Sequence, residues 1–301
     1  MKRRAFLGAG LGLLVTRAAR SDELARPVML GQFHTSYSTD TEHKARASNV
    51  QLAAEAIDGK KLAPGAVFSF NDAVGERTAS FGYAKAVVLR DGLIAEGTGG
   101  GACQVASTLY AAALLAALEI KTRIAHSRPS AYIRVGFDAT VSYPKLDLKL
   151  ANTLADEVII RARASNGNLD VAIEGKTFMP VELTSEILDR VPFTRTLERD
   201  ATVGPDEARR TVFGIPGYRV RRVRSFTTPD GMLHDDVRTD NYPPVPEVLR
   251  VAPGFDVARL GPPEDEEHEA MAKVKIVDAP DALRPLTVQL RPSSIVKVAN
   301  K

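Results

Sequence analysis

The chain has 301 residues, a length that suggests one or two domains. Hydrophobic residues make up 44% and charged residues 26%, which is the composition of a globular protein and excludes a disordered, collagenous or coiled-coil chain. The 40 Lys and Arg nearly balance the 37 Asp and Glu, and the net charge of +3 argues against a nucleic-acid partner. The single cysteine excludes an internal disulfide and a metal site built from several cysteines.

The N-terminal residues have the pattern of an export signal. A basic start is followed by an apolar run from Ala5 to Thr16, which is shorter than the roughly 20 residues that span a bilayer. Residues 3–7 (RRAFL) resemble the bacterial twin-arginine signal, and a general secretory signal with two arginines is the alternative. We therefore expect an exported protein, periplasmic or associated with the bacterial cell envelope, and no membrane span beyond this signal.

The first predicted elements are short strands and one helix. Apolar residues at helical spacing predict a helix over residues 44–58, which Gly59 closes. Strands are expected at 27–37 and at 67–70, the latter ending at Asn71-Asp72; a polar loop follows at 75–82, and a hairpin at 86–94 turns at Asp91-Gly92.

A glycine-rich loop at residues 97–101 precedes an Ala- and Leu-rich stretch without a breaker, which predicts a buried helix over 103–118. An antiparallel series of strands is expected downstream, at 119–124, 132–135, 140–143, 146–150, 158–164 and 169–173. One core helix packed on such a sheet is an α+β fold.

Beyond about residue 180 the chain changes character. Residues 200–252 predict short alternating strands, and the arginines of 218–224 fit the solvent face of an amphipathic strand, with a polyanion-binding patch as the alternative. The final residues, 285–298, form either a last strand or a loosely held tail. The predicted divisions are an export signal at 1–25, a main domain at 28–180, a smaller β-rich extension at 181–255, and an acidic linker and tail at 256–301.

Cys103 is a candidate nucleophile because an unpaired cysteine in an exported protein is exposed to oxidation. It stands at the start of the predicted helix, where unpaired N–H groups and a partial positive charge lower the pKa of a thiol. The preceding glycines allow close approach of a substrate and leave N–H groups to hold an oxyanion. The alternative is a small buried hydrophobic side chain.

A nucleophilic cysteine needs a base, and the base needs an orienting partner. His126 follows at the end of a predicted strand, and Asp138 on a neighbouring strand could lie behind its imidazole. This order of Cys, His and Asp is that of papain-like and transglutaminase-like enzymes. Each part also has an alternative interpretation. His126 could be a core histidine and Asp138 a turn residue. The glycine loop could be a simple helix entry, or a phosphate cradle that lacks its usual Lys.

Several motifs together resemble the VanW domain, in order and with similar spacing over about residues 28–180. A weaker resemblance runs through Gly214, Gly217-Tyr218, Arg224 and Asn241-Tyr242-Pro243-Pro244 to about residue 252. The motifs are 64–71 (PGAVFSFN), 74–78 (VGERT), Gly82-Tyr83, 99–110 (GGGACQVASTLY), His126-Ser127 and 138–141 (DATV).

The resemblance implies peptidoglycan stem peptides as partners, because some members are regarded as L,D-transpeptidases that form 3–3 cross-links. Cys103 would attack the carbonyl of the third stem residue and release D-Ala, His126 would carry the proton, and Asp138 would orient the imidazole. The implied substrate and oxyanion residues are Gly99, Gly100, Gly101, Gln104, Arg77 and Ser127, with a helix cap and a loop salt bridge as the alternatives for Gln104 and Arg77.

Three functions stay open at this point. The first is acyl transfer by a thiol enzyme, the second is a cysteine peptidase or amidase that uses water as acceptor, and the third is a non-catalytic wall-binding module linked to glycopeptide resistance. Neither a metal ion nor an organic cofactor is expected for any of them. The sequence does not indicate an oligomeric state.

Overall fold

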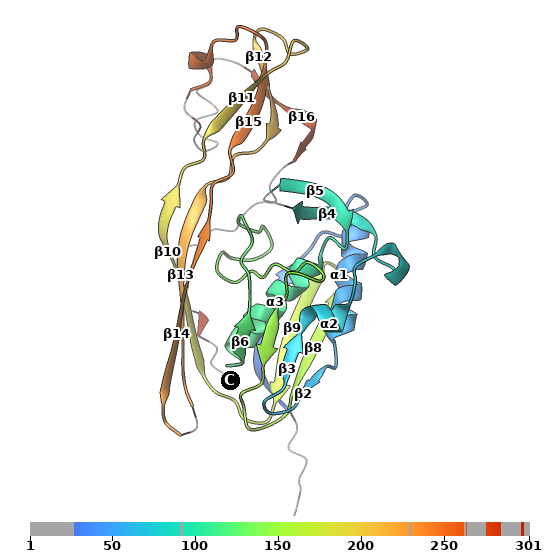
Figure 1. The fold of residues 1–301 in the computed structure, drawn as a ribbon, viewed down its shortest axis with the longest axis vertical. Coiled ribbons are helices and arrows are strands. Elements are labelled where there is room, and N and C mark those ends of the chain that lie inside the picture. The colour runs from blue at the N-terminus through green and yellow to red at the C-terminus, as the bar shows by residue number, and fades with distance from the viewer. Residues whose placement is uncertain are drawn as a thin grey trace, which may run out of the picture.

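Antiparallel sheets dominate the architecture, and one buried helix runs through its main core (Figure 1). The computed structural model describes residues 27–90, 93–228, 230–261, 263, 275–283 and 296–297. The predicted export signal, the turn at Asp91-Gly92 and most of the predicted linker and tail therefore lie outside the described residues. None of the helices in the described ranges has the length and apolar composition of a membrane span. The expected α+β class is confirmed, with strands in excess of helices.

Up to Gly175 the chain builds a helix-and-sheet core. Four strands pair antiparallel in the order β1-β9-β8-β2, three in the order β3-β7-β6, and β4 pairs with β5. The elements are β1 (Val28–Ser36), α1 (Lys44–Ile57), β2 (Lys61–Leu62), β3 (Val67–Ser69), α2 (Phe70–Val74), the 3-10 turn η1 (Ala79–Phe81), β4 (Lys85–Arg90), β5 (Leu93–Thr98), α3 (Ala102–Leu115), β6 (Glu119–Thr122), β7 (Lys149–Ala151), β8 (Val158–Ser165) and β9 (Asn168–Gly175).

Helix α3 is the centre of this core, as its unbroken apolar sequence predicted. Of its 14 residues, Cys103 alone is not buried. The helix packs on β1 and β9, and β1 crosses its C-terminal end at Gly31. A Cβ at Gly31 would stand 2.5 Å from the backbone nitrogen of Ala116, so only glycine permits this close packing of strand on helix.

The later strands form two further sheets. One sheet has the order β14-β13-β10-β17, in which β10, β13 and β14 are long, and a second sheet has the order β11-β15-β12-β16. Figure 1 shows β10, β13 and β14 running beside the helical core, with β11, β12 and β15 beyond one end of them. The elements are β10 (Val181–Val191), β11 (Arg195–Arg199), β12 (Glu207–Val212), β13 (Gly217–Thr227), β14 (Leu233–Tyr242), β15 (Glu247–Val251), η2 (Val257–Arg259), β16 (Lys275–Leu283) and β17 (Val296–Lys297).

Two predicted strands, at 132–135 and 140–143, are wrong. These residues form turns and irregular backbone, with Gly136 in the left-handed region at a φ of 90°. Side chains take the place of a strand ladder here, because Ser107 Oγ accepts from Ala139 N and Cys103 Sγ contacts Val141 N. The predicted strand at 67–70 also ends early, since Ser69 Oγ accepts from Asp72 N and starts α2 at Phe70.

The prediction of a solvent face for the arginines of 218–224 is wrong for two of them. Arg219 and Arg221 are exposed, but Arg222 and Arg224 are buried. Strand β13 lies between β10 and β14, and its inner face turns toward the core. There Asp236 pairs with both buried guanidiniums, and Arg224 also donates to the carbonyl of Leu118.

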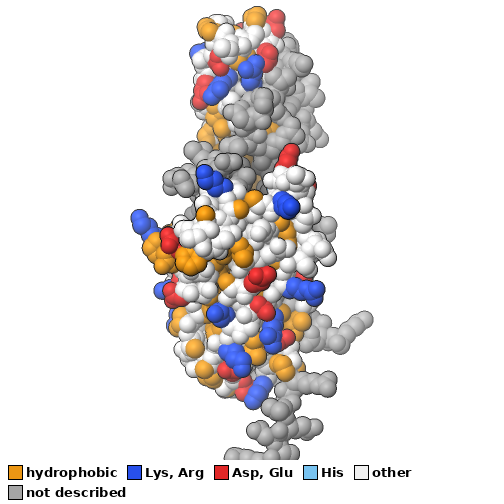
Figure 2. Space-filling model, turned by 90° about the vertical axis from the view of Figure 1, so that its right-hand side faces the viewer, with side chains coloured by type: hydrophobic (Ala, Val, Ile, Leu, Met, Phe, Trp, Pro, Cys, Tyr) orange, Lys and Arg blue, Asp and Glu red, His pale blue; other side chains and the backbone are white. Residues whose placement is uncertain are grey.

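The described surface carries charges of both signs. Figure 2 shows Lys and Arg interspersed with Asp and Glu on the face turned to the viewer, without a field of one sign. The described residues of this face therefore offer no basic stripe for a polyanion.

Candidate active site

Cys103 lies in the first turn of α3 and is half-buried. Its sulfur contacts the main chain of Val141, at 3.4 Å from the carbonyl oxygen and 3.5 Å from the nitrogen. The backbone N–H of Cys103 has no acceptor among the described residues, as expected for the first turn of a helix. The irregular segment 138–141 therefore lies along the helix start and leaves one N–H beside the thiol.

His126 and Asp138 meet next to this thiol, although neither is on a strand. The Nδ1 atom of His126 lies 2.7 Å from Oδ2 of Asp138, and the same oxygen accepts from the backbone nitrogen of His126 at 2.6 Å. Because an ionised carboxylate only accepts, Nδ1 carries a proton and Nε2 is left to act on the thiol. Thr140 N also donates to Ile124 O, which joins the two segments.

The electrostatics favour a thiolate–imidazolium pair. Burial opposes ionisation of Cys103, but a hydrogen bond with His126, the charge on that ring, the N–H of Val141 and Arg77 together lower the pKa of the thiol. Burial also opposes protonation of His126, but Tyr132, Asp138 and Cys103 raise its pKa well above the ordinary value. The two shifts have the signs that an activated nucleophile and its base need.

Asp138 is held by four donated hydrogen bonds. Besides the two from His126, Oδ1 accepts from Arg123 Nη2 at 3.0 Å and from Tyr242 Oη at 2.5 Å. The side chain is 1% exposed. Burial raises the pKa of Asp138, but the hydrogen bond and charge of His126 and the charge of Arg123 lower it far below the usual range. The carboxylate therefore stays charged behind the imidazole.

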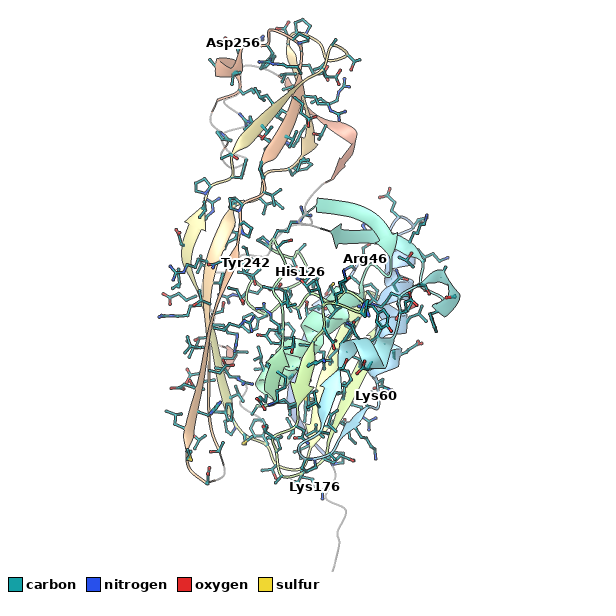
Figure 3. The ribbon with its side chains drawn as sticks, in the orientation of Figure 1. Arg46, Lys60, His126, Lys176, Tyr242 and Asp256 are labelled. Atoms are coloured by element: carbon teal, nitrogen blue, oxygen red, sulfur yellow. The ribbon has the colours of Figure 1, made fainter. Side chains whose placement is uncertain are left out.

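Strand β14 supplies part of this support. Tyr242 comes from its last position, and Asp240, two residues earlier, pairs with Arg123 Nη1 at 2.5 Å. Arg238 bonds Asp240 at 3.2 Å and the carbonyl of Arg123 at 2.9 Å. Figure 3 shows Tyr242 on the side of the long strands, with His126 between it and Arg46. Sequence reasoning missed Arg123, Arg238 and Asp240, and for Tyr242 the signal was its place in the weaker part of the family resemblance.

The glycine loop is packed rather than open. Gly99 has a φ of 83°, and a Cβ there would lie 2.5 Å from Cβ of Arg77. Its N–H donates to Ala84 O at 3.2 Å, so it is not available to an oxyanion as the sequence suggested. Asn49, another residue that sequence reasoning missed, bonds the carbonyls of Gly100 and Ala84. Gly101 has a φ of 118° and caps α3 against Val50.

The remaining predicted site residues have different surroundings. Gln104 was expected to face the substrate, but it is completely buried, and its amide bonds Arg46, Thr35 and the carbonyl of Ser36. Arg77 lies beside the glycine loop and donates to Asn71 Oδ1 at 2.8 Å. Ser127 is exposed next to His126. The structure thus brings Cys103, His126, Asp138 and Arg77 together and directs Gln104 inward.

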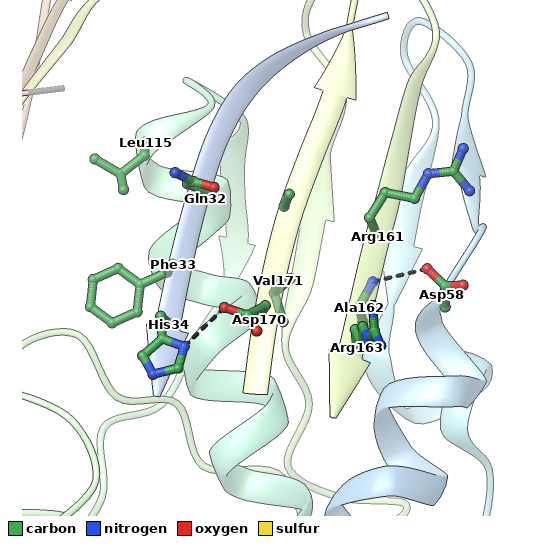
Figure 4. Close-up of a pocket in the computed structure, with 11 residues that line it drawn as sticks. Gln32, Phe33, His34, Asp58, Leu115, Arg161, Ala162, Arg163, Asp170 and Val171 are labelled. Carbon is green, nitrogen blue, oxygen red and sulfur yellow. Dashed lines mark hydrogen bonds and ion pairs between the residues drawn. The ribbon is translucent and has the colours of Figure 1, made fainter. Parts of the chain in front are cut away.

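A separate hollow lies over β1, β8 and β9, away from these residues (Figure 4). His34 pairs there with Asp170 at 2.9 Å, both exposed. None of the predicted site residues lines this hollow. In the described residues, no group of three or more His, Cys, Asp and Glu side chains is placed to hold a metal ion.

This geometry defines a class of protein: an α+β, sheet-rich chain with a Cys–His–Asp cluster at the start of its core helix. Comparison with known proteins finds a family match over less than half of the chain. Residues 45–174 match the family model described as VanW like protein, so the chain carries a VanW-like domain, as the motifs indicated.

Two relatives match part of the chain. It is 39% identical over 144 residues to the uncharacterized protein YoaR of Bacillus subtilis strain 168, covering 48% of this chain and 47% of that protein. It is 32% identical over 127 residues to the vancomycin B-type resistance protein VanW of Enterococcus faecalis strain ATCC 700802 / V583, covering 37% and 46%. The chain therefore spans about half the length of the curated relatives it matches.

Proposed function

We propose that the protein is a cysteine-dependent L,D-transpeptidase that acts on peptidoglycan stem peptides. The observation that carries the proposal is the bond between Asp138 and Nδ1 of His126, beside a half-buried thiol whose pKa is lowered. A papain- or transglutaminase-like catalytic arrangement is part of the proposal. A relative named for vancomycin resistance supports a role at the cell wall.

In the first step, the Cys103 thiolate attacks the carbonyl carbon of the third stem residue and a C–S bond forms. The N–H of Cys103 donates to the resulting oxyanion, and the α3 N-terminus adds a partial positive charge. The His126 imidazolium gives its Nε2 proton to the leaving amine as the C–N bond breaks. The products are a thioester and free D-Ala, and Asp138 keeps the Nδ1 proton in place.

In the second step, the side-chain amine of a neighbouring stem attacks the thioester. The amine gives a proton to Nε2 of His126, the C–S bond breaks, and the thiolate–imidazolium pair is restored. A new amide bond replaces the one broken in the first step, so the reaction needs no oxidant or external energy source. Water in place of the amine would give the hydrolase.

Export belongs to the same proposal, because the substrate lies outside the cytoplasm. We propose that residues 1–25 direct the protein to the periplasm or cell envelope through the twin-arginine route. Replacing Arg3 and Arg4 together by Lys should leave the protein in the cytoplasmic fraction, whereas export of that double variant at the normal level would remove the twin-arginine assignment.

Mass spectrometry of purified muropeptides tests the activity. Wild-type protein should form cross-linked dimers and release D-Ala, Cys103→Ala should do neither, and the exposed control Lys60→Ala should behave as wild type. Shortened monomers without dimers would replace the proposal by the hydrolase. If both proteins bound the muropeptides but left them unchanged, the wall-binding module would replace the proposed transpeptidase.

A further inference from the structure

Two arginines flank Cys103 in addition to the residues that form the proposed catalytic centre. Arg46 lies in the first turn of α1, and Arg77 lies in the loop between α2 and η1. Both are half-buried. The glycine loop that leads to Cys103 packs against both segments, with Gly99 on Cβ of Arg77 and Gly101 on the carbonyl of Arg46. The two arginines therefore lie on separate elements that both pack against the loop leading to Cys103.

Neither guanidinium forms an ion pair with any residue that the structure describes. Arg46 donates to Gln104 Oε1 at 2.8 Å and lies over the ring of Tyr132, whose hydroxyl is 3.5 Å from Nε2 of His126. Arg77 donates from Nη1 to Asn71 Oδ1 and to the carbonyl of Gly75. These neutral acceptors position the two cations without neutralising them.

Arg77 also has an unmet donor. Its Nη2 atom is buried and has no hydrogen-bond partner among the residues that the structure describes. The acidic side chain near it, Asp147, is occupied by Ser69 Oγ at 2.6 Å and Asn71 N at 2.9 Å. A buried donor without an acceptor costs free energy, and a bound ligand is one of the few explanations for it in a native site.

Burial lowers the pKa of both Arg46 and Arg77, while the charge of Cys103 raises it. The two cations thus carry a desolvation cost that an anion would offset. Planar guanidinium groups match the two oxygens of a carboxylate better than other anion-binding side chains do. The α-carboxylate of a terminal residue lies about one residue length, roughly 3.5 Å, beyond the carbonyl before it.

We propose that Arg46 and Arg77 form a carboxylate-binding subsite, which selects acyl donors whose scissile bond is the last in the peptide. The inference rests on the proposed function and extends it, because it assigns the two residues that bind the carboxylate of the leaving residue. A stem peptide that continues past the leaving residue would place an uncharged amide between the two arginines and would be a poor donor.

The kinetic test compares two donors that differ at one end. One is a stem tetrapeptide with a free C-terminal carboxylate, and the other is the same peptide with a C-terminal carboxamide. Wild-type protein should release the last residue from the acid with a kcat/KM about tenfold or more above that for the amide, as the loss of a charge-assisted contact predicts. In Arg46→Met and Arg77→Met that ratio should fall toward one, and Arg163→Met, an exposed residue of β8, should keep it.

A binding test separates failure of the inference from failure of the proposed function. Calorimetry with Cys103→Ala protein, which cannot form the thioester, should give a Kd for the acid about tenfold or more below that for the amide. Preference in binding without turnover by wild type would overturn the proposed reaction but keep the subsite. Equal binding of acid and amide, or binding of neither, would overturn the subsite.

Discussion

Tyr242 donates a hydrogen bond to Oδ1 of Asp138 at 2.5 Å across a separation of 104 residues. The same phenol oxygen accepts from the backbone nitrogen of Gly136 at 2.8 Å. Tyr242 belongs to β14, whereas Asp138 and Gly136 belong to the loop that carries the cluster around Cys103. The long C-terminal strands are therefore part of the structure that orients His126.

Tyr242→Phe should lower the free energy of unfolding. The change leaves one lone pair of Asp138 and the N–H of Gly136 without partners, which costs about 1–3 kcal/mol in unfolding free energy. Denaturant unfolding measures this cost. Tyr218→Phe is the matched control, because Tyr218 is buried in the same hydrophobic cluster and has no hydrogen bond through its hydroxyl among the described residues. Equal effects of the two changes would show that the Tyr242–Asp138 bond contributes nothing specific.

Asp138→Asn should shift the reactivity of Cys103 to higher pH. The carboxylate raises the pKa of His126, and the protonated ring in turn lowers the pKa of Cys103. Removing the charge therefore lowers the pKa of His126 and raises that of Cys103, so less thiolate is present at neutral pH. The rate of alkylation by iodoacetamide, measured against pH in folded protein, reports this shift. An unchanged profile would remove Asp138 from the activation of the thiol.

Asp138 should also contribute to the pH dependence of stability. Its pKa is lowered in the folded state, chiefly by His126 and Arg123 against the opposing effect of burial, so its contribution is present above the ordinary carboxyl pKa of about 3.9. That contribution is lost as the pH falls below this value toward the folded-state pKa. Unfolding free energy measured between neutral pH and the acid range should therefore fall less steeply for Asp138→Asn than for wild type. Parallel curves for the two proteins would contradict the depressed pKa.

The parts of the site that could be predicted are those that follow a periodic or compositional pattern. An unbroken Ala- and Leu-rich stretch indicated α3, and the glycines before Cys103 indicated its start. The adjacency of His126 and Asp138 was also predicted, but with each residue on a strand, whereas β6 ends at Thr122 and the strands expected on either side of Asp138 are irregular backbone. Irregular segments hold the pair instead, and their contacts with Ser107 and Cys103 follow no period in the sequence.

The site residues that could not be predicted depend on contacts between segments far apart in the sequence. Arg123 and Asp240 are separated by 117 residues, and nothing near either residue indicates the other. Likewise, Gln104 follows the candidate nucleophile directly, which suggested contact with substrate. A residue one position further along a helix points in a different direction, and here that direction is the core.

Gly99→Ala should destabilise the protein more than alanine at another glycine of the same backbone conformation. At Gly99, with a φ of 83°, the new Cβ would lie 2.5 Å from Cβ of Arg77 and 3.0 Å from its Cγ. The cost therefore combines the roughly 1–2 kcal/mol of a left-handed alanine with about 1–3 kcal/mol for overpacking. Gly65→Ala is the control, because Gly65 has a φ of 78° and open space within 4 Å, so only the backbone cost applies.

Gly99→Ala also tests whether the contact between Gly99 and Arg77 affects the carboxylate-binding subsite. Because Arg77 must move to relieve the contact, Gly99→Ala should weaken the preference of the protein for a donor with a free carboxylate, and Gly65→Ala should not. Urea unfolding gives the stability difference, and the acid-to-amide ratio of kcat/KM gives the effect on the subsite. If Gly99→Ala and Gly65→Ala lost equal stability and kept the same ratio, the contact between Gly99 and Arg77 would be irrelevant to both.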